Sequence, residues 1–253
     1  MTEPVLEVRD LVMTFGGVKA VSNVSFRVDK GEMVGLIGPN GAGKTTTLKA
    51  IMGVTPITGG RLLLDGQDIS ALKTSRRNGL GLAMSHQIVR PFRQMTIVDN
   101  VTLAAGGAIT RRPLTSIFHI SRARERKLAL AALERVNIAH FGPRGAAKQP
   151  LGVLKRLEVA RALATNPRIL LLDEPLAGLG HGETRPIADL IKSLNADGVT
   201  ILLVEHNLVE ARRICSRFVV LDNGRKIADG PADEVMRDPS VIDAYIGKDV
   251  VDA

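Results

Sequence analysis

The sequence predicts an α/β fold: a parallel sheet, an antiparallel β region near the N-terminus, and a helical lobe inserted in the middle. Apolar runs such as "ILLL" and "ILLV" are typical of strands covered on both faces, as in a parallel sheet. Helical patterns follow such runs along the chain, which favours alternating strands and helices. Long helical patterns dominate the stretch from about 88 to 165.

The first third of the chain is rich in strand patterns. Alternating or short apolar runs predict strands at 5–15, 20–29, 31–38 and 61–69, the last with an Asp-Gly turn. A helical pattern occupies 45–52, and another strand is expected to end near Gln87. These elements supply the antiparallel region and the first strands of the parallel sheet.

The remaining two thirds combine the helical lobe with a return to strand and helix alternation. Helical patterns occupy 121–138, 146–163, 183–195 and 208–217. Strand patterns occupy 168–175, 199–206 and 218–230. We expect one domain over residues 5–247, with the helical subdomain of about 88–165 inserted within it.

Composition narrows the possible partners. The net charge of +8 favours nucleotides, anionic lipid headgroups or nucleic acid, or it serves solubility alone. Aromatic residues make up 3% of the chain, without Trp, which argues against stacking platforms for single-stranded nucleic acid. The single Cys215 excludes an internal disulfide and fits a reducing cytosol. Without a secretion signal or a long apolar run, the protein is expected to be intracellular.

The strongest functional motif is "GLIGPNGAGKTTT", which contains G-x-x-x-x-G-K-[ST] between a strand pattern and a helical pattern. Glycines in such a loop let main-chain N–H groups surround phosphate oxygens, while the lysine adds positive charge near the β and γ phosphates. The threonine after the lysine can ligate Mg²⁺. The candidate phosphate-binding residues are Gly38, Pro39, Asn40, Gly41, Ala42, Gly43, Lys44, Thr45 and Thr46.

A second motif, "RILLLDEPLAGL", brings Asp173 and Glu174 to the carboxyl end of a buried strand, where α/β sheets place ligands. Neighbouring residues of an extended chain point in different directions. We therefore expect Asp173 to support the metal, together with Thr45, and Glu174 to face a water. Alone, the pair would more simply be a solvated acidic turn, but the phosphate loop favours the catalytic interpretation.

Two further strand ends carry candidate catalytic side chains. The strand "ILLVEHNLVE" ends in Glu205, His206 and Asn207, and it is expected to lie beside the Asp173 strand. His206 is then a candidate hydrogen-bonding sensor of the γ-phosphate or the attacking water. Gln87 sits where a strand-end amide can complete Mg²⁺ or water coordination.

Taken together, these motifs resemble the nucleotide-binding subunit of ATP-binding-cassette transporters over nearly the whole chain. The resemblance implies a P-loop NTPase (RecA-like) core with an N-terminal antiparallel β-subdomain and an inserted helical subdomain. It also implies an ATPase that uses ATP and Mg²⁺, with Gln87 as the Q-loop and His206 as the H-loop. Phe15 matches the aromatic residue that packs on adenine in this family, and Val18 flanks the same face.

The family resemblance also implies partners. It predicts a head-to-tail ATPase dimer, either homodimeric or with a second ATPase, on integral-membrane permease subunits. The insert and the C-terminal tail resemble the branched-chain amino acid uptake group, in which an external binding protein captures the substrate. We therefore expect a peripheral subunit at the cytoplasmic face of the inner membrane, with no nucleic-acid partner.

The stretch before "RLEVARAL" departs from the family signature L-S-G-G-Q. Gln149, Pro150, Leu151, Gly152 and Val153 take its five positions, so only the second glycine remains. Either Gly152 and the main-chain N–H groups at the helix start suffice for the γ-phosphate, or a second ATPase supplies the intact signature. Gly180 also stands where an Asp or Asn is common in the D-loop.

Three rival functions remain open at this stage. One is an ABC protein that acts on nucleic acid or ribosomes, although the chain lacks a second cassette and sustained heptads. Another is a regulatory subunit that binds ATP and hardly hydrolyses it, for which Pro150 is the best support. A P-loop kinase would leave the helical lobe and the "LDEP" motif unexplained.

Overall fold

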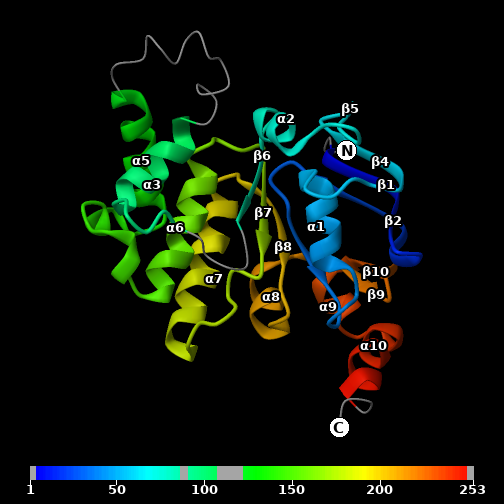
Figure 1. Cartoon of the computed structure of the whole chain (residues 1–253). Coiled ribbons are helices and arrows are strands. Elements are labelled where there is room, and N and C mark those ends of the chain that lie inside the picture. The colour runs from blue at the N-terminus through cyan, green and yellow to red at the C-terminus, as the bar shows by residue number, and fades with distance from the viewer. Residues whose placement is uncertain (1–3, 86–90, 107–121, 250–253) are drawn as a thin grey trace.

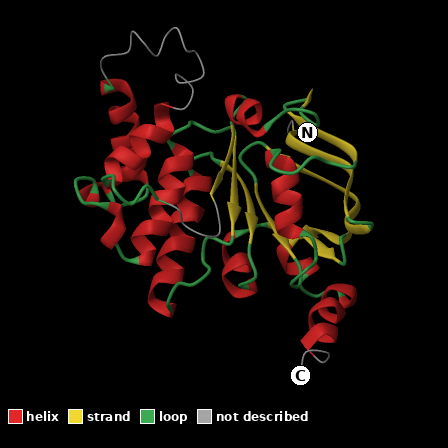
Figure 2. Ribbon diagram, in the orientation of Figure 1, coloured by secondary structure: helices red, strands yellow, loops and turns green. Residues whose placement is uncertain are grey.

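The computed structural model describes residues 4–85, 91–106 and 122–249, which form two sheets with helices around them (Figures 1 and 2). The larger sheet has the strand order β10-β9-β3-β8-β7-β6. Its parallel strands are β3 (Met33–Ile37), β6 (Leu82–Ser85), β7 (Ile169–Asp173), β8 (Thr200–Val204) and β9 (Arg217–Asp222). At one edge β10 (Arg225–Pro231) pairs antiparallel with β9.

The smaller sheet is antiparallel and has the order β2-β1-β4-β5. It consists of β1 (Pro4–Phe15), β2 (Val18–Asp29), β4 (Gly59–Leu64) and β5 (Gln67–Asp68). The β1–β2 hairpin turns at Gly16 and Gly17, both with positive φ, a conformation that glycine adopts without strain. This sheet confirms the predicted antiparallel β-subdomain.

The helices occupy two regions of the molecule. Helices α3 (Ile97–Ala105), α5 (Ala123–Arg135) and α6 (Leu151–Leu163) pack together as a helical lobe at the left of Figure 1. The other helices lie around the sheets: α1 (Lys44–Met52), α2 (Thr74–Gly79), α7 (His181–Ala196), α8 (Leu208–Ile214), α9 (Ala232–Val235) and α10 (Pro239–Asp249). Short 3₁₀ turns occur at Ala139–Phe141 and Ala146–Lys148. None of the helices in the described ranges has the length and hydrophobicity that crossing a membrane requires.

The helical lobe agrees with the helical patterns expected between about 88 and 165. Helix α5 fits within the predicted 121–138 segment, and α6 ends at the predicted Leu163. The domain limits 5–247 and 88–165 themselves remain predictions.

Two apolar cores lie on opposite faces of the larger sheet. In β3, Met33 and Ile37 join the core shared with the helical lobe, α7 and α8, whereas Val34 and Leu36 join the core shared with α1 and the smaller sheet. Strands β7 and β8 divide their side chains between the same two cores. The central strands are therefore buried on both faces, as their continuous apolar runs predicted.

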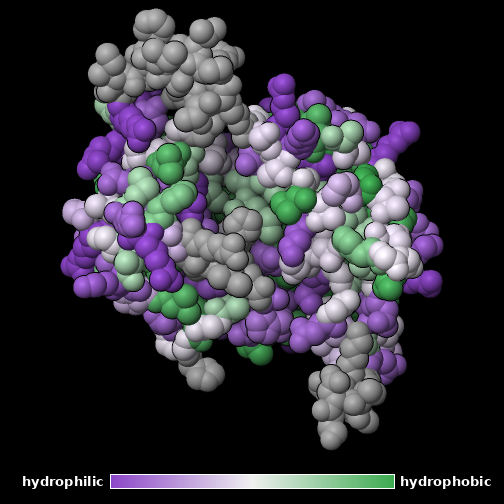
Figure 3. Space-filling view, in the orientation of Figure 1, coloured by the Kyte–Doolittle hydropathy of each residue, from purple (hydrophilic) through white to green (hydrophobic). Residues whose placement is uncertain are grey.

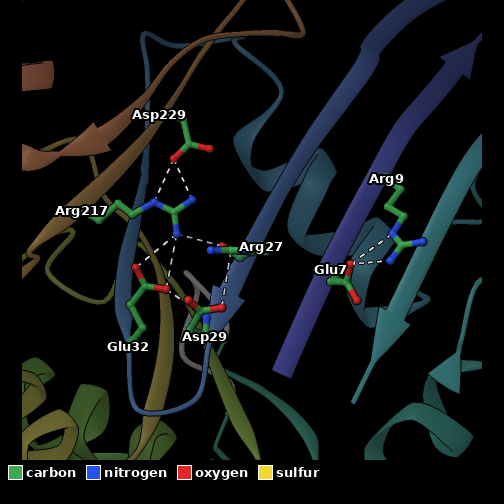
Figure 4. A network of polar contacts seen from close by, with 7 residues as sticks. All are labelled: Glu7, Arg9, Arg27, Asp29, Glu32, Arg217 and Asp229. Atoms are coloured by element: carbon green, nitrogen blue, oxygen red, sulfur yellow. Dashed lines mark hydrogen bonds and ion pairs between the residues drawn. The ribbon is translucent and has the colours of Figure 1, made fainter. Parts of the chain in front are cut away.

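Arg217, at the start of β9, connects several segments of the chain through polar contacts (Figure 4). Its Nη1 lies 3.1 Å from Glu32 Oε1, and its Nη2 lies 2.7 Å from Asp229 Oδ1 of β10. Nη1 also donates a hydrogen bond to the main-chain oxygen of Arg27 in β2 at 3.1 Å. The network therefore joins the smaller sheet to the edge of the larger one.

Arg77 of α2 is buried beneath the C-terminal end of α1. Its guanidinium donates hydrogen bonds of 2.6–2.9 Å to the main-chain oxygens of Ala50, Ile51, Ser70 and Leu72. Burial lowers the pKa of this guanidinium, which nevertheless stays charged because the pKa of arginine is so high. Arg77 thus satisfies the last carbonyls of the helix that follows the phosphate loop.

Cys215 is buried at the C-terminal end of α8. Burial raises the pKa of its thiol to about 12, so the thiol stays protonated at neutral pH. This environment agrees with the passive role expected for the single cysteine.

We predict that Arg77→Met destabilises the fold by about 2–4 kcal/mol, because it removes a buried guanidinium that donates to four main-chain oxygens. Urea unfolding followed by circular dichroism measures this loss. Arg76→Met is the matched control, since Arg76 lies on the same short helix with an exposed side chain. Equal midpoints for the two variants would contradict the role given to Arg77.

Candidate nucleotide site

The phosphate loop connects β3 to α1, at the carboxyl end of a central strand. Gly38 begins the loop with φ of +146°, and a Cβ added there would lie 2.0 Å from the main-chain oxygen of Leu221. Gly41 and Gly43 also have positive φ, of +79° and +99°. Glycine is therefore required at Gly38 both by the conformation and by the neighbouring strand β9.

Lys44 begins α1 and is buried within this loop. Its Nζ donates hydrogen bonds to the main-chain oxygens of Gly38 at 2.7 Å and Pro39 at 2.9 Å. The loop therefore curves around the ammonium group, while Asn40 and Gly41 at its tip are exposed. A positive charge enclosed by a glycine-rich turn is an arrangement suited to phosphate oxygens.

Thr45, in the first turn of α1, meets Asp173, the last residue of β7, although 128 positions separate the two residues in the sequence. The Thr45 hydroxyl donates a hydrogen bond of 3.2 Å to Asp173 Oδ1. Hydroxyl and carboxylate oxygens are the ligands that Mg²⁺ prefers, with phosphate oxygens and waters completing its shell. Within the described ranges no cluster of three or more His, Cys, Asp or Glu could hold a metal ion.

Glu174 follows Asp173 but does not continue the strand. Its φ is +48°, in the left-handed region, which costs a non-glycine residue about 1–2 kcal/mol. We expected simple alternation of an extended chain to separate the two carboxylates, whereas a left-handed turn does so. The turn places Glu174 Oε2 3.6 Å from Nδ1 of His206, which follows β8.

The left-handed turn is supported from two sides. The Glu174 N–H donates to the oxygen of Val204 at 2.9 Å, and the Lys155 ammonium of α6 donates to the Glu174 oxygen at 3.1 Å. One residue beyond Pro175, the Leu176 N–H donates to Glu205 Oε1 at 2.8 Å. Strand β8 and helix α6 therefore fix the turn that carries Glu174.

Lys155 and Glu205 are charged side chains that the sequence left without a role. Burial raises the pKa of Glu205, which has no exposed surface, and lowers the pKa of Lys155. Lys155 lies within a helix that also carries Arg156, Glu158 and Arg161, so the sequence did not show that this lysine is buried. Glu205 stood at a strand end beside His206, but nothing in the sequence distinguished it from a solvated residue.

Gly152 lies in the first turn of α6 and is buried. A Cβ at this position would lie 2.6 Å from Oε1 of Glu183, in the first turn of α7. Pro150 caps the helix without a side-chain hydrogen bond, as the divergent signature predicted. The start of α6 therefore offers main-chain N–H groups and no hydroxyl.

Phe15 and Val18 face each other across the β1–β2 hairpin. Both are exposed, by 47% and 70% of their surface, so either is accessible to a ligand. The main-chain oxygen of Ala20, two residues after Val18, lies close to Gly43: a Cβ added to Gly43 would be 2.7 Å from it. The hairpin therefore lies beside the phosphate loop. Gln87 lies outside the described residues, and its coordinating role remains a prediction.

The phosphate loop, the Thr45–Asp173 pair and the Glu174–His206 pair define a P-loop ATPase of the ATP-binding-cassette class. The chain belongs to this family: the family model described as ABC transporter matches residues 21–177. A second model, described as branched-chain amino acid ATP-binding cassette transporter, matches residues 225–251. The protein is thus an ATP-binding subunit and ATPase, with ATP and Mg²⁺ as its nucleotide and metal.

Several curated relatives span the full chain. The high-affinity branched-chain amino acid transport ATP-binding protein BraF of Pseudomonas aeruginosa is 39% identical, with 98% of this chain and 100% of BraF covered. LivG of Escherichia coli, with the same description, is 37% identical at the same coverage. The lipopolysaccharide export system ATP-binding protein LptB of E. coli is 34% identical, with 96% of this chain and 98% of LptB covered.

Solved structures confirm the RecA-like core with its β and helical subdomains. The ADP conformation of MJ1267, an ATP-binding cassette of an ABC transporter, has a TM-score of 0.84 and 31% identity, over 97% of this chain and 100% of that one. A dimeric post-hydrolysis state of the cassette MJ0796, bound to ADP and Pi, has a TM-score of 0.76 and 25% identity, over 90% and 98%.

We predict that Gly38→Ala weakens ATP binding by more than about tenfold, because its methyl group would displace the loop from the Leu221 oxygen. Titration with a fluorescent ATP analogue measures the dissociation constant. Gly66→Ala, outside the phosphate loop, is the control: Gly66 also has a positive φ, of +74°, and a Cβ there would meet nothing within 4 Å, so it tests backbone strain alone. A normal affinity for the Gly38 variant would contradict this geometry.

Proposed function

We propose that this chain powers a membrane importer of branched-chain or related amino acids by hydrolysing ATP at the site described above. The observation that supports the ATPase site most directly is the convergence of Thr45 with Asp173 and of Glu174 with His206 at the carboxyl ends of β7 and β8. The match of residues 225–251 supports the substrate class. Overall identity alone does not decide the substrate class, because LptB, at similar identity, belongs by its name to a lipopolysaccharide export system.

In the proposed mechanism each residue has a distinct task. The loop amides and Lys44 bind the β and γ phosphates, with the ammonium turning from the Gly38 and Pro39 oxygens toward phosphate oxygens. Glu174 accepts a proton from the attacking water. His206, 3.6 Å from Glu174 Oε2, orients that carboxylate and the transferred phosphate.

Other residues are assigned to the metal ion and to the adenine ring of ATP. Thr45 and Asp173 would hold Mg²⁺, which neutralises charge on the β and γ phosphates when bound. Gln87 is assigned to the same coordination shell or to the water. Phe15 and Val18 are assigned to the adenine, which fits their exposure beside the loop.

We assign the second ATPase of the assembly to a different chain. Pro150 replaces a hydroxyl donor at the start of α6, and Val153 replaces an amide. A missing hydrogen bond to a charged group costs roughly 1.5–3 kcal/mol, so the site that receives this α6 would be the weaker one. In the other composite site, the phosphate loop and Glu174 of this chain would face an intact signature from its partner.

A groove between the helical lobe and the core is the proposed contact for the membrane permease. It has a volume of about 330 Å³ and a mixed lining: apolar side chains come from Met52, Val54, Leu82, Ala83, Met84, Ala104 and Ala162, and polar ones from Thr74, Asn78, Glu158, Arg161 and Thr165. Figure 3 shows a hollow with apolar side chains on this face of the molecule. An apolar helix end from the permease would fit it and place the subunit peripherally, at the cytoplasmic face of the inner membrane.

We predict that Glu174→Gln lowers ATP turnover by about 100-fold or more while ATP still binds, because the amide cannot accept the proton. Phosphate release by the chain in its membrane complex gives turnover, and analogue fluorescence gives affinity. Glu234→Gln, an exposed change on α9, is the control. Unchanged turnover in the Glu174 variant would refute the catalytic assignment.

We predict that Ala104→Arg reduces sedimentation of the chain with native inner-membrane vesicles by about tenfold, because a charged side chain would fill the groove. ATP affinity should not change, since Ala104 lies on α3. Ala131→Arg, at an exposed position of α5 in the same lobe, should sediment like the wild type. Equal loss for both variants would place the contact elsewhere.

A further inference from the structure

Helix α6 carries two residues of interest, Gly152 and Lys155, about one turn apart. Gly152 stands in its first turn, at the position of the family signature, and Lys155 follows three residues later. Residues three apart lie on the same side of a helix. The Lys155 side chain is 5% exposed, and its Nζ donates to the main-chain oxygen of Glu174 at 3.1 Å. One face of α6 therefore holds both the signature glycine and a direct contact with the catalytic turn.

Lys155 is buried among several carboxylates, which stabilise its positive charge. The carboxylates of Glu205, Glu174, Glu158 and Asp173 all raise its pKa, against the larger opposing effect of burial. Glu205 is fully buried; its Oε1 accepts the Leu176 N–H, and its Oε2 has no hydrogen-bond partner. The Glu174 turn is thus held at two points: the Lys155 ammonium binds the Glu174 oxygen, and the buried Glu205 carboxylate binds the Leu176 N–H.

The Glu174 turn requires such support. A residue before proline disfavours helical conformations, and Glu174, which precedes Pro175, is in the left-handed region. The direction of the Glu174 carbonyl is coupled to the backbone angle that also directs its side chain. A donor that holds this carbonyl therefore holds the direction in which the Glu174 side chain leaves the main chain, without touching the carboxylate itself.

We propose that Lys155 is a positioning residue for Glu174: its ammonium holds the Glu174 carbonyl, and through it α6 sets the aim of the catalytic carboxylate. This inference rests on the proposed function, because it requires Glu174 to act on the attacking water. Since the start of α6 faces the partner subunit in the proposed dimer, the same helix would report nucleotide bound there to the carboxylate of this chain.

The test compares Lys155→Met with Lys155→Arg, in the chain assembled with its membrane partners. Methionine keeps an unbranched apolar side chain, one atom shorter, and loses the donor, so turnover should fall by about tenfold or more while ATP affinity stays within about twofold. Arginine restores a charged donor and should recover most of the turnover. Lys127→Met, at an exposed position of α5, is the matched control and should behave as the wild type.

A second variant separates positioning from stability. Lys155→Met leaves Glu205 buried without its nearby cation, which lowers the melting temperature. Adding Glu205→Gln removes that charge but keeps an oxygen for the Leu176 N–H, so stability should return while turnover stays low. Recovery of turnover together with the melting temperature would overturn the proposal, because stability alone would then explain the loss.

Three further results would contradict the positioning role of Lys155. Wild-type turnover in Lys155→Met, equal loss in Lys155→Arg, or a loss explained by weaker ATP binding would each overturn the positioning role. Failure of the proposed function has a different signature, since Glu174→Gln would then retain turnover. If Glu174→Gln is inactive and Lys155→Met is fully active, only the role of Lys155 is wrong.

Discussion

Burial of β3, β7 and β8 on both faces is the constraint on which the site depends. Each strand divides its apolar side chains between two cores, so a slip of one residue would move every side chain into the wrong core. The register is therefore fixed, and with it the common edge at which the three strands end. The phosphate loop, Asp173 and His206 come together because they follow strands that have no freedom to shift.

Precision at this edge comes from polar contacts that the apolar cores cannot provide. The cores determine where β7 ends, but the direction of Glu174 depends on a left-handed turn held by Val204, Lys155 and Glu205. Buried charges of this kind are costly unless they are paired or hydrogen-bonded. These buried charges hold the turn that carries Glu174, the proposed catalytic carboxylate, so their cost is offset where the geometry of the site is set.

The sequence predicted the fold well, because burial and turn chemistry leave strong local patterns. Continuous apolar runs predicted the central strands, and the spacing of glycines and lysine predicted a phosphate loop between a strand and a helix. The left-handed Glu174, the Lys155 contact and the proximity of Glu183 to Gly152 were not predictable. Each depends on packing between segments distant in sequence, and a single charged residue on a helix does not show which carbonyl it will meet.

The four hydrogen bonds of Arg77 have an electrostatic consequence for the phosphate loop. A helix carries partial positive charge at its N-terminus and partial negative charge at its C-terminus. Arg77 places a buried cation on the negative pole of α1 and so neutralises it. What remains at the other end of α1, next to the proposed triphosphate site, is closer to a lone positive pole than to a dipole, and its field decays more slowly with distance.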